Sequence, residues 1–147
     1  MKVIVDSDAC PVKNIILQCC KKADIPVIYV HSISHLSNNS LGAETIVVDN
    51  SSQAADMEII KHTGKGDLIV TSDIGLAAIV LGKGAHVLSF SGYAYTNDNI
   101  ELHLEQRYLN QRILASKGRL KGPSKRTNSD NEAFKAALEK FLLNTSS

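Results

Sequence analysis

The chain has 147 residues, of which 44% are hydrophobic and 21% charged, and its formal net charge is +1. This length and composition predict one globular domain, residues 1–147, with a core of its own. No stretch approaches the roughly 20 apolar residues of a membrane-spanning helix, and the near-neutral charge does not by itself indicate a polyanionic partner. Three cysteines without a CxxC pair argue against a disulfide framework or a zinc knuckle, so we expect a soluble, cytoplasmic protein.

The segment VIVDSDACPV, residues 3–12, joins an apolar run to two carboxylates. The run predicts a buried strand that ends at Asp6, and a helical pattern opens near Pro11. Two carboxylates about 5 Å apart repel by roughly 3 kcal/mol at an effective dielectric constant of about 20, so they need a cation, a shared proton or good solvation. Asp8 has a second interpretation, as the cap of the following helix. Asp6 lies too early in the chain to cap it.

The rest of the chain alternates apolar strands with helices. Hydrophobic runs bounded by turns predict strands at residues 26–31, 45–49, 67–73 and 85–90. Helical spacing predicts helices at about 11–23, 51–64, 74–84, 97–116 and 128–143. A long polar segment at 32–44 and a basic, glycine-containing loop near 117–128 separate some of these elements. The helix at 97–116 carries its apolar side at Ile100, Leu104, Tyr108, Leu109 and Ile113.

Strands that are continuous apolar runs and alternate with helices predict an α/β fold in three layers, with a mostly parallel five-stranded sheet between the helices. We expect the strand order 3-2-1-4-5. Ligands bind such sheets at the carboxyl ends of the strands, where the strand order reverses. That reversal would bring Asp6, Asp8 and Asp73 into one crevice, and Asp56, about one turn into a helix, could point into the same space.

The four carboxylates predict a site of hard oxygen ligands without histidine or cysteine, which favours Mg²⁺ or Mn²⁺ over Zn²⁺. Such a cluster suits phosphodiester cleavage. The predicted catalytic and metal-binding residues are therefore Asp6, Asp8, Asp56 and Asp73. As for Asp8, a structural interpretation stays open for two more of them, because Asp73 is also placed to cap a helix and Asp56 could be a solvated helix residue.

The predicted substrate contacts are basic or hydroxylated. Ser72 is expected to cap a helix or to orient Asp73, and solvent or an ion pair is the simpler expectation for Arg107 on the long helix. The basic loop combines glycine-rich backbone with cations, which suits phosphate contacts that do not depend on sequence. The full candidate set is Ser72, Arg107, Lys117, Arg119, Lys121 and Lys125.

The motifs VDSDACPVK, GDLIVTSDIGLAA, YTNDNI and KGP, with the acid of AADMEI, together resemble the YaiI/YqxD family of uncharacterised bacterial proteins over nearly the whole chain. The resemblance implies a PIN-like or NYN-like α/β domain related to metal-dependent nucleases, in a family whose own activity is not established. By position, the four acids named above match the acids of the family, and Arg107 matches a basic position on its long helix.

The chain departs from the family pattern in two loops. Ser91 stands where an arginine is common, and Pro123 is followed by Ser124 instead of an aromatic residue. Both changes affect loops that the resemblance implies to face phosphate, and neither touches the four acids.

The sequence therefore predicts a Mg²⁺- or Mn²⁺-dependent nuclease acting on RNA or another single-stranded nucleic acid. One alternative is a domain that binds RNA or a protein without catalysis. Another is a phosphatase similar to the haloacid dehalogenases, with Asp6 as nucleophile, but that class needs a further acidic pair and one acid follows the fourth strand here. No feature of the sequence indicates an oligomeric state.

Overall fold

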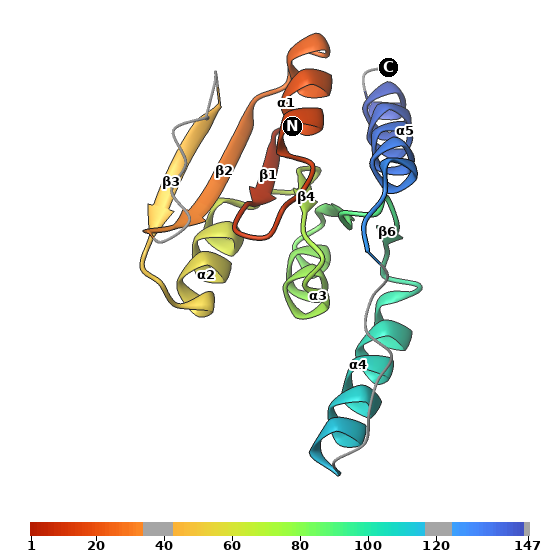
Figure 1. Cartoon of the computed structure of the whole chain (residues 1–147). Helices are drawn as coiled ribbons and strands as arrows, with labels where there is room; N and C mark the ends of the chain where they lie inside the picture. Colours follow the sequence, from red (N-terminus) through yellow and green to blue (C-terminus); the bar gives the residue numbers. More distant parts are fainter. Residues whose placement is uncertain (34–42, 117–124, 146–147) are drawn as a thin grey trace.

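The computed structural model of the chain describes residues 1–33, 43–116 and 125–145 (Figure 1). Within these ranges, the strands are β1 (Val3–Asp6), β2 (Val27–Ser32), β3 (Glu44–Val48), β4 (Leu68–Val70), β5 (His86–Leu88) and β6 (Ala94–Tyr95). The helices are α1 (Lys13–Lys22), α2 (Ser52–His62), α3 (Ile74–Gly82), α4 (Ile100–Ala115) and α5 (Asn128–Thr145). As predicted, a helix follows each of β1, β3 and β4, whereas β2 and β3 have no helix between them in the described residues.

The strands form one sheet in the order β3-β2-β1-β4-β5-β6. The four pairings from β3 to β5 are parallel, and β6 pairs with β5 in the antiparallel direction. The predicted order 3-2-1-4-5 is confirmed, and with it the reversal of strand order between β1 and β4. The sequence did not predict β6, because a strand of two residues is too short to show a hydrophobic period.

Two apolar clusters fill the two faces of the sheet and make the fold a three-layer structure. Side chains alternate between faces along a strand, so Val3 and Val5 of β1 join one cluster while Ile4 joins the other. The first cluster includes the buried faces of α1 and α5, with Phe134 fully buried in it. The second is covered by α2 and α3 and includes Ile59. Asp6 has the same parity as Ile4 and therefore points toward the α2 and α3 side.

The long helix α4 extends away from the sheet (Figure 1). Ile100 in its first turn is buried and Leu104 is half-buried, but the predicted apolar side then continues into solvent at Tyr108, Leu109 and Ile113. The spacing of these residues is helical, as expected, but most of them do not form core. Within the described ranges, no helix has the length and apolar composition that crossing a bilayer requires.

The carboxylate of Asp67 lies at the amino ends of β1 and β4, the opposite end of these strands from Asp6. Its side chain accepts hydrogen bonds from the Lys2 ammonium at 2.6 Å, the Gly64 backbone N at 2.8 Å and the Lys2 backbone N at 3.1 Å. Burial alone would raise the pKa of Asp67, but these bonds and the Lys2 charge outweigh it and hold the pKa below its ordinary value. Asp67 therefore joins the start of β4 to the start of β1 and has a structural role.

Candidate active site

The four predicted acids come from three segments that meet at the carboxyl edge of the sheet. Asp6 is the last residue of β1, and Asp8 lies in the loop that follows. Asp73 is the N-cap residue of α3 and is separated from the end of β4 by Thr71 and Ser72, and Asp56 lies in α2. Because β1 and β4 are parallel neighbours, their carboxyl ends place Asp6 beside the start of α3.

Thr71 links two of these acids. Its hydroxyl donates a hydrogen bond to Oδ2 of Asp6 at 2.9 Å and accepts one from the backbone N of Asp73 at 3.0 Å. The neighbouring Ser72 was predicted to cap a helix or to orient Asp73, but its hydroxyl instead accepts a hydrogen bond from the backbone N of Phe90 at 3.1 Å. Strand alternation was the available signal, since Thr71 has the parity of Ile69 and therefore faces the same side as Asp6.

Asp73 caps α3, as the structural interpretation expected. Its Oδ1 accepts from the backbone N of Gly75 at 2.9 Å and of Leu76 at 3.3 Å. The Arg107 guanidinium lies 3.9 Å from the same oxygen, and both side chains are nearly half exposed, so solvent screens this ion pair. A Cβ at Gly75 would lie 2.7 Å from Nη1 of Arg107. The glycine therefore gives Arg107 room at the start of α3.

The capping interpretation of Asp8 is wrong. Helix α1 begins later than predicted, with Val12 at its N-cap and no side-chain capping bond, because residues 11 and 12 still form a turn. Asp8 instead accepts a hydrogen bond at 2.8 Å from the backbone N of Ser32, at the end of β2. The carboxylate therefore ties the loop after β1 to the neighbouring strand.

The charges of the acids affect one another. Burial raises the pKa of Asp6, the hydrogen bond from Thr71 opposes this, and the nearby charges of Asp73 and Asp8 raise it further. For Asp56, burial and then the charges of Asp73 and Asp6 raise the pKa to about 6, with Arg107 opposing. The four carboxylates thus form one electrostatic group, with Asp6 and Asp73 at its centre.

Among the described residues, several oxygens of this group receive no hydrogen bond. Within the described residues, no hydrogen bond is made by the carboxylate of Asp56, by Oδ1 of Asp6 or by Oδ2 of Asp73. In the same part of the chain, no three acidic, histidine or cysteine side chains are arranged to hold a metal ion directly. Mg²⁺ commonly keeps several waters and takes only one or two carboxylates. The open oxygens therefore fit a partly hydrated divalent ion better than a closed protein cage.

The remaining predicted contacts have different outcomes. Lys125 is exposed just before α5, whereas Lys117, Arg119 and Lys121 lie outside the described residues. Arg126, which was not predicted, donates to the carbonyl of Phe90 at 2.7 Å and to Asn131 at 2.7 Å. It therefore fixes the segment before α5 against the loop after β5.

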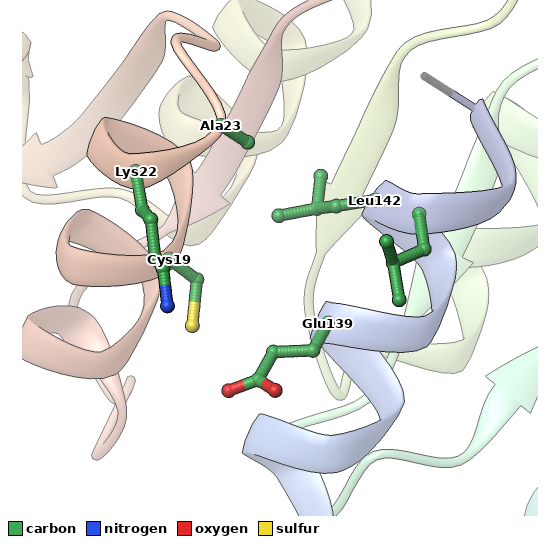
Figure 2. Close-up of a pocket in the computed structure, with 6 residues that line it drawn as sticks. Cys19, Lys22, Ala23, Glu139 and Leu142 are labelled. Carbon is green, nitrogen blue, oxygen red and sulfur yellow. The ribbon is translucent and has the colours of Figure 1, made fainter. Parts of the chain in front are cut away.

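A cavity of about 380 Å³ lies away from the acids, between α1 and α5 on the other face of the sheet (Figure 2). Figure 2 shows the side chains of Cys19, Lys22 and Glu139 at the gap between the two helices. Burial, and then the charge of Glu139, raises the pKa of the Cys19 thiol, so the thiol stays protonated near neutral pH. The cavity and the acidic group are separate features.

The fold and the acidic edge together define a three-layer α/β protein with a cluster of carboxylates where its strand order reverses. Residues 4–144 match the family model described as "Uncharacterized BCR, YaiI/YqxD family", and the chain belongs to this family. It is 54% identical over 142 residues to a UPF0178 protein of Alkaliphilus metalliredigens, covering 97% of this chain and 92% of that one. It is 48% identical over 145 residues to a UPF0178 protein of Bacillus cereus (strain Q1), with coverage of 97% and 99%.

Among solved structures, the chain is similar to the crystal structure of Rae1 (YacP) from Bacillus subtilis. The TM-score is 0.45 at 14% sequence identity, with all of both chains covered. A similarity at this level carries no argument about function.

Proposed function

We propose that this protein is a nuclease that depends on Mg²⁺ or Mn²⁺ and hydrolyses phosphodiester bonds in RNA or another single-stranded nucleic acid. The observation that supports it best is the set of carboxylate oxygens on Asp6, Asp56 and Asp73 that have no hydrogen bond within the described residues, at the reversal of strand order. Burial is the largest cause of the raised pKa of Asp56, and repulsion from the charges of Asp73 and Asp6 raises it further. A bound dication would relieve that repulsion.

In this proposal Asp6, Asp8, Asp56 and Asp73 hold the divalent ion, which when bound would stabilise the charge that develops on the phosphate and lower the pKa of water. Thr71 keeps the Asp6 carboxylate in one orientation through its 2.9 Å bond. Arg107, 3.9 Å from Asp73 and nearly half exposed, is free to turn toward a phosphate of the substrate.

The exposed Lys125 would contact the phosphate backbone, and the same role is proposed for Lys117, Arg119 and Lys121, which lie outside the described residues. The Ser72 hydroxyl would contribute mainly by holding the loop after β5 through its bond to Phe90. We also place the protein in the cytoplasm, where the free and buried thiols of its cysteines suit a reducing compartment.

The test is Mn²⁺-dependent cleavage of end-labelled single-stranded RNA by the wild type and by an Asp6→Asn/Asp73→Asn variant. Asparagine keeps an oxygen for the bond from Thr71 and is itself a good N-cap, so the variant removes charge more than structure. We expect the rate to fall by at least about 100-fold, because even groups that only support metal ligands contribute about 10- to 100-fold. An unchanged rate would refute the proposal.

A matched control is Asp49→Asn. Asp49 is an exposed aspartate that follows β3, two strands away from β1 in the sheet. Like Asp6, Asp49 lies at the carboxyl end of a strand, but that strand, β3, is an outer strand of the sheet. Cleavage by this variant should equal that of the wild type.

A second candidate function is binding of RNA without cleavage. One observation favours it, namely that within the described residues no three potential ligands are already arranged around a metal position. Binding to RNA that weakens steeply with salt, with no cleavage in Mg²⁺ or Mn²⁺, would support this function over the nuclease.

A further inference from the structure

Three aromatic rings form a cluster at the β6 edge of the sheet, which we call the aromatic platform: Tyr93, Tyr95 and His103. The ring centroids lie 5.4 Å apart for Tyr93 and Tyr95, 5.1 Å for Tyr93 and His103, and 5.2 Å for Tyr95 and His103. The ring planes are nearly perpendicular, at 71° to 83°, so no ring covers another by stacking. The Tyr93 hydroxyl also lies 3.0 Å from Nε2 of His103, which fixes the two rings relative to each other.

The backbone under the aromatic platform is held firmly. The carbonyl of Tyr93 accepts from the backbone N of Ser89 at 2.8 Å, and the backbone N of Tyr93 donates to the Ser89 hydroxyl at 3.0 Å. The Asn99 side chain donates to the carbonyl of Ala94 at 3.0 Å and accepts from the backbone N of Thr96 at 2.9 Å. These bonds join β6 to the start of α4, so the rings are organised before any ligand binds.

The exposure of Tyr93 separates the platform from ordinary core. Tyr95 packs against the apolar cluster under α2 and α3, as a core aromatic would. Tyr93, in contrast, is 45% exposed although its ring, its hydroxyl and its backbone all contact neighbouring residues. A rigid, exposed ring is a feature that binding sites use, because little conformational entropy is lost when it makes a contact.

The aromatic platform lies toward the same end of the strands as the acids, the carboxyl end of the parallel strands. Tyr93 follows the loop that leaves the carboxyl end of β5, and the bond from Phe90 to Ser72 joins this loop to the one that carries Asp73. On α4, His103 precedes Arg107 by four residues, about 6 Å along the helix axis. Arg107 in turn reaches to 3.9 Å from Asp73. Aromatic rings, a guanidinium and carboxylates therefore follow one another along one side of the molecule.

We infer that the aromatic platform stacks a base of a single-stranded nucleic acid, with Arg107 contacting a neighbouring phosphate. This inference rests on the proposed function for the choice of ligand. Every base offers a flat aromatic face, so a ring that stacks on it binds with little sequence preference. A base in a duplex is already stacked on its neighbours, so the platform selects an unpaired strand. The paired arrangement of rings and cation matches the alternation of base and phosphate in such a strand.

The test compares two labelled oligonucleotides by fluorescence anisotropy in the presence of EDTA, so that no cleavage takes place. One is a single strand of mixed sequence, and the other has the same backbone without bases. We expect the wild type to bind the first more tightly by about 10- to 100-fold, the range for loss of stacking at one or two bases. Tyr93→Ala should reduce this ratio toward one, whereas Tyr93→Phe, which keeps the ring, should retain most of it.

Tyr108→Ala is the matched control. Tyr108, which lies on α4, is an exposed tyrosine like Tyr93, but it is not part of the aromatic platform. Its ring instead faces Arg112, with the guanidinium carbon 5.9 Å from the ring centroid. Its substitution should leave the ratio unchanged. A second readout is available because the chain has four tyrosines and no tryptophan. Base stacking should quench the tyrosine emission of the wild type, and less so that of Tyr93→Ala.

The outcomes separate this inference from the proposed function. Equal binding of both oligonucleotides, unchanged binding by Tyr93→Ala in a variant that melts like the wild type, or no binding at all would overturn the aromatic platform. Base-dependent binding without any metal-dependent cleavage would keep the platform and reject the nuclease. Metal-dependent cleavage without base dependence would do the reverse.

Discussion

Replacing Thr71 with valine is the most informative single change in this fold. Valine is β-branched like threonine, so the shape of the side chain at this fully buried position is kept while the hydroxyl is lost. Two hydrogen bonds are lost with it, the one to Oδ2 of Asp6 at 2.9 Å and the one from the backbone N of Asp73 at 3.0 Å. The Thr71→Val variant therefore tests whether this hydroxyl connects β1 to the start of α3.

The expected magnitude follows from the charged acceptor. A hydrogen bond to a charged group contributes about 1.5–3 kcal/mol to the free energy of unfolding. For a chain of 147 residues this corresponds to a fall in Tm of about 3–10 °C. The pKa of Asp6 should rise further, because the bond from Thr71 is the contact that lowers it against burial. If Asp6 holds a metal ion, affinity for Mn²⁺ should also fall by about 10- to 100-fold, as for other residues that orient a ligand.

Urea denaturation at neutral pH measures the change, with Thr145→Val as the control. The Thr145 hydroxyl also donates hydrogen bonds, to the carbonyls of Phe141 and Leu142 at 3.2 Å, but Thr145 is an exposed residue at the end of α5. That variant should change stability by less than about 0.5 kcal/mol. Equal, small effects of the two substitutions would refute the role assigned to Thr71.

Three further predictions concern charge and backbone conformation. Asp67→Asn should flatten the acid limb of the stability curve: the pKa of Asp67 is held below 3.8 in the folded state, so its contribution is present at neutral pH and is lost as the pH falls through the folded value. The pKa of Asp56 shifts the other way, to about 6, so without metal its contribution is greatest below 3.8 and is lost as the pH rises through about 6. In urea denaturation measured between about pH 4 and pH 7, Asp56→Asn should remove this pH-dependent loss of stability. The affinity of the wild type for Mn²⁺ should decrease when the pH is lowered below about 6. Gly92→Ala should lower Tm clearly more than Gly66→Ala, because φ is 87° and 86° at the two glycines but only at Gly92 would a Cβ meet backbone, 2.9 Å from the carbonyl of Ala133. Equal shifts in Tm would contradict the packing argument.

Hydrophobic pattern and topology were sufficient to predict the framework of this fold. Apolar runs located the five parallel strands, and the rule that ligands bind where the strand order reverses predicted that Asp6 and Asp73 lie together at the carboxyl ends of β1 and β4. Strand ends were less accurate. The strand predicted at 67–73 is Leu68–Val70 in the structure, because the residues after Val70 leave the sheet to begin α3, and apolar pattern does not show where a ladder of hydrogen bonds ends.

The side-chain partners in the site could not be predicted in the same way. Asp8 bonds the end of β2 and Thr71 bonds Asp6, two contacts between residues far apart in the sequence. Such choices depend on the register of neighbouring strands, which a single sequence does not specify. The exposure of the second half of α4 could not be predicted for a similar reason. Helical spacing identifies the apolar side of Leu109 and Ile113, but it cannot show that the helix runs beyond the sheet that would cover it.

Calorimetric titration with Mn²⁺ tests the central claim most directly, because it measures the acidic group without assuming a substrate. The wild type should bind Mn²⁺ with release of protons, since the pKa of Asp56 is about 6. The Asp6→Asn/Asp73→Asn variant should show no binding, and the Asp49→Asn control should bind as the wild type does. If the wild type and the double variant give the same titration, the acids do not form a metal site, and Asp73 is a helix cap with Asp6 as its hydrogen-bonded neighbour.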